Sequence, residues 1–226
     1  MNQPIKLSPS DLTFLWDECK RCFYLKYIHG ITRPAGPFPS IFGTIDRLMK
    51  GHFEGRPTSE LDRDLPPGVI QFAEKWVESE PLSLPGHAAQ CYIKGKFDTV
   101  AAFEDGSYGV VDFKTSSPQP YHVPFYGRQL HSYAYALEHP AEGKFTLRPI
   151  SKLGLLVVAP SDMQVDAQGR IAYLGDVSWL EIPLNEAGFV QFLGDVLTLL
   201  ESPELPPAGG KCAYCQYREH ARQHGM

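Results

Sequence analysis

The sequence predicts a single domain of the α/β or α+β class. Its 226 residues suit one domain that buries a substantial core. Apolar residues recur at helical spacing in several segments and form short runs typical of strands in others. In chain order these segments are helices, a hairpin, a helix, strands and a last helix, a mixture that is typical of α/β and α+β domains.

Two helices are expected before the first strands. In residues 8–27, apolar and aromatic residues follow at steps of three and four, and Cys19 and Cys22 fall on the same stripe. A run rich in proline and glycine interrupts this pattern, and residues 41–53 resume it. The apolar face of that second helix is expected to be Ile41, Ile45, Leu48 and Met49. A further short helix is expected at residues 69–79.

The middle of the chain is expected to form a hairpin followed by a helix. Residues 89–103 and 108–115 are rich in β-branched and aromatic residues, and the turn between them contains an Asp-Gly pair. Cys91 is expected to be a core residue of the first strand. Residues 126–138 are amphipathic at helical period, so the next helix is expected there.

The last third of the chain is expected to add two strands and a helix. Residues 153–158 form an apolar run typical of a buried strand, and residues 177–184 form a second strand. Residues 185–200 are expected to be helical, with Asn185 as the N-terminal cap. A linker rich in proline and glycine then leads to the last two cysteines.

Composition sets limits on the function. The hydrophobic content of 43% is ordinary for a globular protein, and no stretch reaches the roughly 18 apolar residues that a membrane span needs. The first residues lack the apolar segment of a secretory signal, so we expect a cytoplasmic protein without membrane association. The net charge of -5 does not by itself indicate nucleic-acid binding, which would then depend on a local basic track.

Three charged residues of the hairpin form a candidate catalytic site. Asp112 and Lys114 are two residues apart on one strand, so their side chains project from the same face. Asp98 is expected on the neighbouring strand. Two adjacent carboxylates suit Mg²⁺ or Mn²⁺, and a lysine beside them can orient or deprotonate water, or neutralise charge on a phosphate. The alternative is a surface salt bridge, which the apolar residues of the same strand disfavour.

Five short segments of the chain occur in a characteristic order. They are the opening helix with Cys19-Lys20-Arg21-Cys22-Phe23-Tyr24, then Gly43-Thr44-Ile45-Asp46, Gly95-Lys96-Phe97-Asp98, Val110-Val111-Asp112-Phe113-Lys114, and Gln129-Leu130-His131-Ser132-Tyr133. In this order they resemble the PD-(D/E)XK nuclease superfamily. The resemblance is closest to the RecB-like branch, which includes the CRISPR-associated adaptation exonucleases and the nuclease domains of helicase–nucleases.

The resemblance implies a fold and an activity. The fold would be a restriction-endonuclease-like core, with helices flanking a mixed central sheet. The activity would be that of a Mg²⁺- or Mn²⁺-dependent DNA nuclease, an exonuclease in particular, acting in repair, recombination or CRISPR-type DNA processing. The implied catalytic residues are Asp98, Asp112, Lys114, Gln129 and Tyr133, and the implied metal ligands are Asp46, Asp98, Asp112 and the Phe113 carbonyl. Asp46 stands where this branch most often has histidine.

Four of the five cysteines form two pairs, Cys19-x-x-Cys22 and Cys212-x-x-Cys215. Such pairs in a reduced setting are typical of metal or cluster ligands, and their spacing suits a 4Fe–4S cluster or Zn²⁺. The resemblance favours a 4Fe–4S cluster that joins the two ends of the chain. It would form a subdomain of residues 1–30 and 203–226 within one nuclease domain, 1–226. The family divides its cysteines one and three, whereas this chain divides them two and two.

Other functions remain open from the sequence. The chain could be a catalytically inactive nucleic-acid-binding module of the same fold, or a zinc-stabilised interaction domain. The expected substrate is single-stranded or end-bearing DNA, and a helicase or a recombination or CRISPR protein is an expected partner. The aromatic residues Tyr121, His122, Phe125 and Tyr126 are expected in a loop after the second hairpin strand, where they would either stack on a single strand or pack within the loop.

Overall fold

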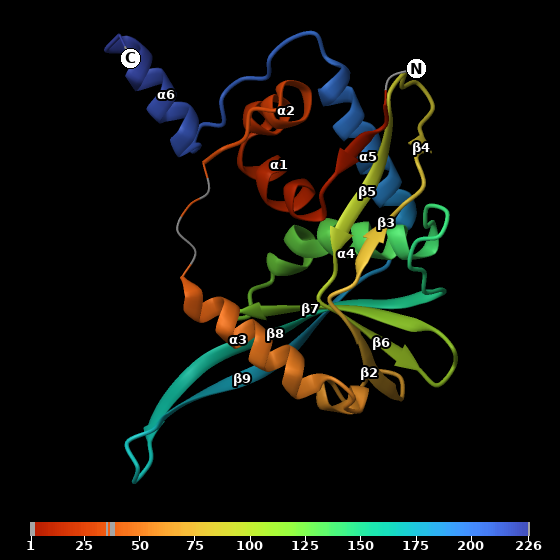
Figure 1. The fold of residues 1–226 in the computed structure, drawn as a ribbon, viewed down its shortest axis with the longest axis vertical. Helices are drawn as coiled ribbons and strands as arrows, with labels where there is room; N and C mark the ends of the chain where they lie inside the picture. The colour runs from red at the N-terminus through yellow and green to blue at the C-terminus, as the bar shows by residue number, and fades with distance from the viewer. Residues whose placement is uncertain (1–2, 35, 37–38, 226) are drawn as a thin grey trace.

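Two β-sheets organise the chain (Figure 1). The computed structural model describes residues 3–34, 36 and 39–225. The larger sheet has the strand order β2-β6-β7-β8-β9, and the smaller has the order β1-β5-β3, with β4 also paired to β5. Helices flank both sheets. The predicted α/β architecture with a mixed sheet between helices is therefore confirmed, although the strands divide into two sheets.

The elements have the following bounds. The strands are β1 (Ile5–Leu7), β2 (Gly68–Ala73), β3 (Trp76–Glu78), β4 (Leu82–Ser83), β5 (Gln90–Lys96), β6 (Thr99–Phe103), β7 (Tyr108–Thr115), β8 (Ile150–Val165) and β9 (Ile171–Ile182). The α-helices are α1 (Trp16–Glu18), α2 (Lys20–His29), α3 (Ser40–Phe53), α4 (His122–Glu138), α5 (Glu186–Glu201) and α6 (Ala213–Gln223). A π-helical turn, η1 (Asp11–Leu15), and a 3-10 turn, η2 (Thr58–Glu60), complete them.

Strand β7 lies at the centre of the larger sheet and is buried on both faces. It pairs antiparallel with β6 and parallel with β8. Val110 belongs to the main core with α4 and α5, whereas Val111 and Phe113 belong to a second core beneath α3. Phe113 stacks on Phe53, the last residue of α3, with ring centroids 5.8 Å apart. Burial on both faces explains why the consecutive residues Val110 and Val111 of this strand are both apolar.

The predicted helix at residues 8–27 is wrong in its middle. The backbone at Cys19 is extended, with φ of −164° and ψ of 109°, and it separates α1 from α2. The Cys19 sulfur accepts a hydrogen bond from the Gly209 N–H at 3.3 Å. In a continuous helix the Cys19 side chain would point in a different direction and would not make this contact. A tertiary contact therefore outweighs the local helical pattern.

The predicted helix at residues 69–79 is also wrong, because this segment forms β2 and β3. Its apolar residues imitate helical spacing, but Ile70 and Val77 are buried on different strands. Glu74, with φ of +50°, lies in the turn between them. At the start of β2, a Cβ on Gly68 would overlap the Ala102 carbonyl oxygen, so glycine permits the close pairing with β6.

The first strand of the predicted hairpin is too long. The actual hairpin is β6–β7, and β5 belongs to the smaller sheet. Phe97 and Asp98 lie between β5 and β6, where the chain passes from one sheet to the other. Asp98 is thus at a junction between the sheets and not within a strand of the hairpin.

Several other expectations are confirmed or corrected by the described residues. Asn185 caps α5, and its side chain accepts a hydrogen bond from the Gly188 N–H at 2.9 Å. Cys91 is buried in β5 as expected. Ile41 and Leu48 are 53% and 64% exposed, so the expected apolar face of α3 is wrong at those positions. Helix α6 lies outside the segments expected to be helical. No helix in the described ranges has the length and apolar character needed to cross a membrane.

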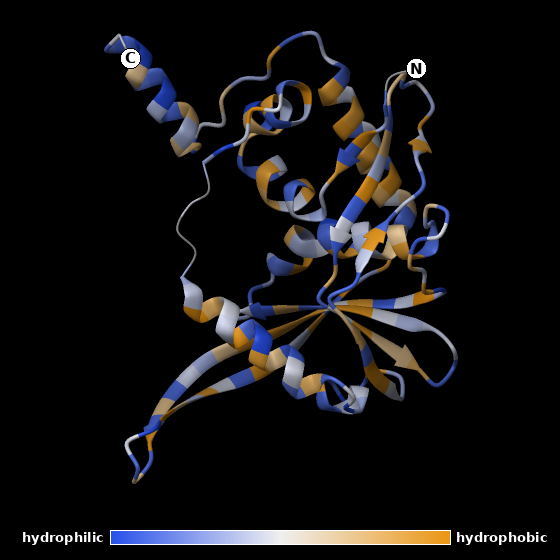
Figure 2. Cartoon of the chain, in the orientation of Figure 1, coloured by the Kyte–Doolittle hydropathy of each residue, from blue (hydrophilic) through white to orange (hydrophobic). Residues whose placement is uncertain are grey.

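The strands β8 and β9 are longer than predicted. Their far ends form a two-stranded arm that carries both apolar and polar residues (Figure 2). The arm and α6 lie at opposite ends of the longest axis of the molecule (Figure 1). Helix α4 packs against β5, β7 and β8, and so connects both sheets.

Substitution of Gly154 on β8 tests the close packing of this strand against Trp179 of β9. A Cβ at this position would overlap the indole ring of Trp179 on β9. We expect Gly154→Ala to lower the free energy of unfolding by about 1–3 kcal/mol, measured by urea denaturation. Gly51→Ala is the control, because nothing lies within 4 Å of its added Cβ and the change favours the helix by up to about 1 kcal/mol. An unchanged stability of Gly154→Ala would contradict this packing.

Candidate active site and cysteine centre

The candidate active site begins with a charged pair on β7. Asp112 is 2% exposed, and its Oδ2 pairs with the Lys114 ammonium on the same face of the strand. Asp98 approaches from the junction between β5 and β6. Its Oδ2 accepts a hydrogen bond from the Phe113 N–H at 3.2 Å, and its carboxyl group also contacts that of Asp112. The structure therefore brings the three charged residues together.

Helix α4 adds the two further residues that the sequence predicted. Gln129 Nε2 donates to Asp112 Oδ1 at 3.4 Å and to the Tyr133 hydroxyl at 3.3 Å. Gln129 and Tyr133 are four residues apart, so they lie on the same face of the helix. Both are buried. Gln129 thus connects Asp112 to Tyr133, while the Gln129 Oε1 is buried without a hydrogen-bond partner.

A second lysine, which the sequence pattern did not single out, occupies the other side of Asp98. Lys50 Nζ lies 2.8 Å from Asp98 Oδ1, 2.8 Å from Asp46 Oδ2 and 3.1 Å from Glu74 Oε1. Asp46 is therefore joined to Asp98 through an ammonium group. Lys50 follows Asp46 by four residues on α3, a spacing that would have indicated the pair. Nothing local indicates Glu74, because it reaches the site through the turn between β2 and β3.

Burial controls the electrostatics of the pair on β7. Loss of water raises the pKa of Asp112, Lys114 opposes that rise, and the charge of Asp98 adds to it. Burial lowers the pKa of Lys114, but the carboxylates of Asp112 and Asp98 outweigh it and raise that pKa above the ordinary value. Lys114 is therefore an ammonium at neutral pH, and its nitrogen lies 4.6 Å from the centroid of the Tyr126 ring.

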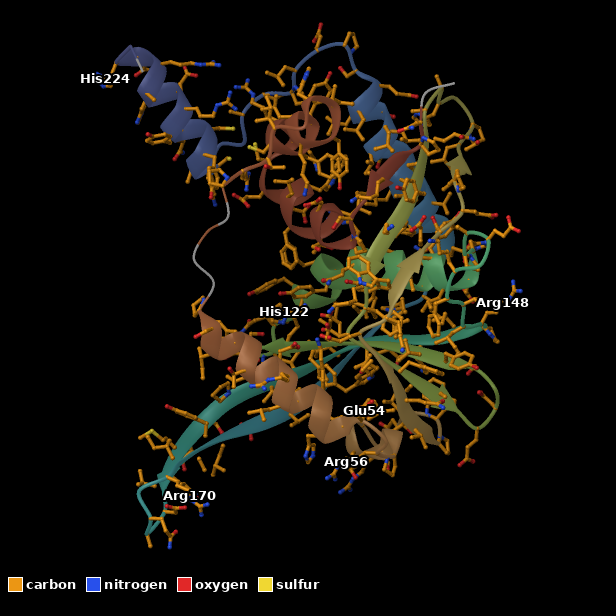
Figure 3. The ribbon with its side chains drawn as sticks, viewed as in Figure 1. Glu54, Arg56, His122, Arg148, Arg170 and His224 are labelled. Atoms are coloured by element: carbon orange, nitrogen blue, oxygen red, sulfur yellow. The ribbon has the colours of Figure 1, made fainter. Side chains whose placement is uncertain are left out.

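The aromatic residues expected in a loop belong instead to the beginning of α4. Tyr121 is the N-terminal cap position, and His122, Phe125 and Tyr126 form the first turns. Figure 3 labels His122 at this end of α4, on the side toward α3. Its pKa is lowered by burial and by the positive charge of Lys114, so the imidazole is neutral at pH 7.

The acidic residues fit a hard divalent cation. Asp98 and Asp112 offer carboxylate oxygens that contact one another, and the charge of Asp98 helps to raise the pKa of Asp112. Oxygen ligands of this kind suit Mg²⁺ and Mn²⁺. Phe113 lies between Asp112 and Lys114 in β7, with its carbonyl as a further candidate ligand. Within the described ranges, the acidic residues form no compact group of three ligands, because Lys50 lies between Asp46 and Asp98.

The second candidate centre is a group of four buried cysteines, which we call the four-cysteine group: Cys19, Cys22, Cys212 and Cys215. All four sulfur atoms lie within 4.8 Å of one another. The group joins the N-terminal helices to the C-terminal segment, as predicted. His224, which lies at the far end of α6 (Figure 3), is remote from it along that helix.

Two neighbours donate hydrogen bonds to the four-cysteine group. Arg33 Nη2 donates to Cys212 Sγ at 3.1 Å, and the Gly209 N–H donates to Cys19 Sγ. Burial raises the pKa of Cys19, but hydrogen bonds from the backbone of Cys22 and Gly209 outweigh it and lower that pKa to about 6. Burial raises the pKa of Cys22 and Cys215. The group therefore favours a bound cation, which would allow all four thiols to ionise.

Similarity to one family of known proteins extends over most of the chain. The family model described as the PD-(D/E)XK nuclease superfamily matches residues 58–220, more than half of the chain. A solved structure, "Crystal structure of SSO0001", has 18% sequence identity and a TM-score of 0.49, over 97% of this chain and 86% of that chain. No curated protein matches the sequence.

Lys50 provides a test of the charge balance around Asp98. We expect Lys50→Met to lower the free energy of unfolding, measured by urea denaturation without divalent metal, by about 1–3 kcal/mol. The reason is that three carboxylates lose their common counter-ion. The control is Lys96→Met, whose exposed ammonium pairs with Glu74 at 3.2 Å and should contribute less than about 1 kcal/mol. Equal stability of the Lys50 variant and the parent would contradict this balance.

Proposed function

The chain belongs to the PD-(D/E)XK nuclease superfamily, and we propose that it is a Mg²⁺- or Mn²⁺-dependent deoxyribonuclease. The observation that carries this proposal is the contact of Asp98, Asp112 and Lys114 beside Gln129. Burying a carboxylate is costly, and here a second carboxylate lies against the buried one. A divalent cation shared by the two would remove their repulsion.

Asp98 and Asp112 would hold the metal, with the Phe113 carbonyl and Asp46 as further ligands. When bound, a divalent ion polarises a phosphate and lowers the pKa of water. For Asp46 to reach the ion, its contact with Lys50 would have to change. The other residues of the site act through hydrogen bonds and charge.

Lys114 serves as a cation in this proposal. Its raised pKa keeps it protonated, so it orients the attacking water and offsets the negative charge that develops on the phosphate. A role as general base is disfavoured, because a protonated amine accepts no proton. Gln129 holds Asp112 Oδ1 and contacts Tyr133, and thereby fixes the carboxylate next to Asp98.

An aromatic surface beside Lys114 supports single-stranded or end-bearing DNA as the substrate. The Phe14 ring of η1 contacts Phe125 and Tyr126 of α4, with centroid distances of 5.4 Å and 5.8 Å. Phe14 is 40% exposed and Tyr121 is 62% exposed. Unpaired bases stack on exposed aromatic rings, whereas paired bases are stacked within a duplex. The surface therefore fits unpaired bases whose phosphates approach Lys114.

The wider role follows from the sequence resemblance. We propose an exonuclease that works in the cytoplasm in repair, recombination or CRISPR-type DNA processing, with a helicase or another recombination or CRISPR protein as its partner. The whole chain, 1–226, would form one nuclease domain, in which residues 1–30 and 203–226 make a metal-binding subdomain.

A catalytically inactive DNA-binding module is the second candidate function. The position of Lys50 favours it, because this ammonium already neutralises Asp98 without a metal. The two functions differ in one measurable property, since an inactive module would bind single-stranded DNA without cleaving it in Mg²⁺ or Mn²⁺.

Removal of either member of the pair on β7 tests the proposed activity. We expect Asp112→Asn and Lys114→Met to reduce Mn²⁺-dependent cleavage of labelled single-stranded DNA by about 100-fold or more. EDTA should abolish cleavage by the parent, and added Mn²⁺ should restore it. Lys152→Met is the control, because this lysine of β8 pairs with Glu181 at 2.8 Å. Cleavage by Asp112→Asn at the parental rate would overturn the assignment.

Phe14 tests the aromatic surface separately from the chemistry. We expect Phe14→Ala to weaken binding of a fluorescent thymidine oligonucleotide by about fivefold or more, because stacking on one base contributes about 1–3 kcal/mol. The measurement is fluorescence anisotropy, with Ca²⁺ in place of Mg²⁺ to prevent cleavage. Tyr217→Ala on α6 removes a ring that is 73% exposed and should leave binding unchanged. Parental affinity of Phe14→Ala would exclude the surface from DNA binding.

A further inference from the structure

The sulfur positions of the four-cysteine group distinguish between one metal ion and a cluster. Three pairs of sulfur atoms are close: Cys19–Cys215 at 3.6 Å, Cys22–Cys212 at 3.7 Å and Cys22–Cys215 at 3.7 Å. A tetrahedral Zn²⁺ with four sulfur ligands at about 2.3 Å places neighbouring sulfurs about 3.8 Å apart. The three distances agree with that value.

The same distances do not fit a 4Fe–4S cluster. In such a cluster each cysteine binds a different iron, and the iron–sulfur bonds to the cysteines point outward from the cluster. Two cysteine sulfurs therefore lie roughly 6 Å apart. Here every sulfur lies within 4.8 Å of the others. The sulfur–sulfur distances in a cluster are roughly 6 Å, whereas the distances here are at most 4.8 Å. To bind a cluster, every pair of sulfur atoms would therefore have to move apart by more than about 1 Å.

The surroundings of the four-cysteine group oppose such an expansion. An added Cβ on Gly209 would lie 2.7 Å from the Glu18 carbonyl oxygen and 3.2 Å from the Cys19 Cβ, so the C-terminal segment already lies directly against Cys19. The Cys212 N–H donates to the Gly209 carbonyl at 3.0 Å, which holds the second pair to that contact. All four cysteines are 7% exposed or less.

The two cysteine pairs also occupy equivalent positions, each at the beginning of a helix. Cys19 is the N-terminal cap of α2 and Cys212 is the N-terminal cap of α6, and in each pair the second cysteine lies three residues on, in the first turn. Backbone N–H groups at a helix N-terminus stabilise thiolates. Two equivalent pairs, each at a helix N-terminus, complete a four-coordinate site without a fifth ligand.

We propose that the four-cysteine group binds a single Zn²⁺ ion tetrahedrally, in place of the 4Fe–4S cluster that the sequence resemblance implies. Four thiolates and Zn²⁺ carry a net charge of −2, which Arg33 partly offsets through its contact with Cys212 at 3.1 Å. The ion joins the beginning of α2 to the beginning of α6 and so crosslinks two segments that are far apart in the sequence. The inference is independent of the proposed nuclease activity, because these cysteines make none of the contacts of Asp98, Asp112 and Lys114.

The metal content of the intact protein tests this inference. The chain would be produced in medium that contains both iron and zinc, purified without oxygen, and analysed for metals and acid-labile sulfide. We expect one zinc per chain, no sulfide and no absorbance band near 400 nm. About four irons and four sulfides per chain, a single iron without sulfide, or a protein without bound metal would each overturn it.

Thiol titration of the parent protein assigns the ion to the cysteines. A mercurial reagent should release one equivalent of zinc, which a chromogenic chelator detects. Failure to release zinc would contradict ligation by thiolates. Cys215→Ser should lower the zinc content, whereas Cys91→Ala should retain one zinc, because Cys91 lies in β5 outside the group. Since the titration uses the unaltered chain, it stays informative even where Cys215→Ser fails to fold.

Discussion

The burial of Asp112 beside Lys114 is the constraint on which the rest of the site depends. An isolated carboxylate in the core would lose several kcal/mol of hydration, so each of its oxygens needs a partner. Lys114 pairs with one oxygen and Gln129 donates to the other. Strand β7 provides this position because its neighbours Val111 and Phe113 anchor its opposite face beneath α3. The packing of two cores against one strand therefore fixes the charged pair.

The requirement for compensating charge extends outward from that pair. Asp98 lies against Asp112 and draws the Lys50 ammonium to its other side, and Lys50 in turn gathers Asp46 and Glu74. This arrangement connects α3, the turn after β2 and the junction between the sheets. The same arrangement sets a condition on the proposed metal binding, because a divalent ion would compete with Lys50 for the carboxylate of Asp98.

Local sequence pattern predicts part of this structure and long-range contacts determine the remainder. The two-residue spacing of Asp112 and Lys114 requires only that the segment be a strand, and the four-residue spacing of Gln129 and Tyr133 requires only a helix. The position of Asp98 depends on a change of sheet that alternation does not reveal. The break at Cys19 likewise depends on Gly209, which lies 190 residues away in the chain. Cysteine spacing predicts a metal centre, but only the sulfur distances distinguish zinc from a cluster.

The proposed binding of a divalent metal by Asp98 and Asp112, at the point where Lys114 would meet the phosphate, is open to direct observation. The measurement is anomalous X-ray diffraction from crystals grown with Mn²⁺ and a short single-stranded oligonucleotide. We expect a manganese peak bonded to the carboxylates of Asp98 and Asp112, with the Lys50 ammonium moved away from Asp98. Crystals that contain the oligonucleotide but show no manganese there, with Lys50 still paired to Asp98, would contradict the proposed metal site.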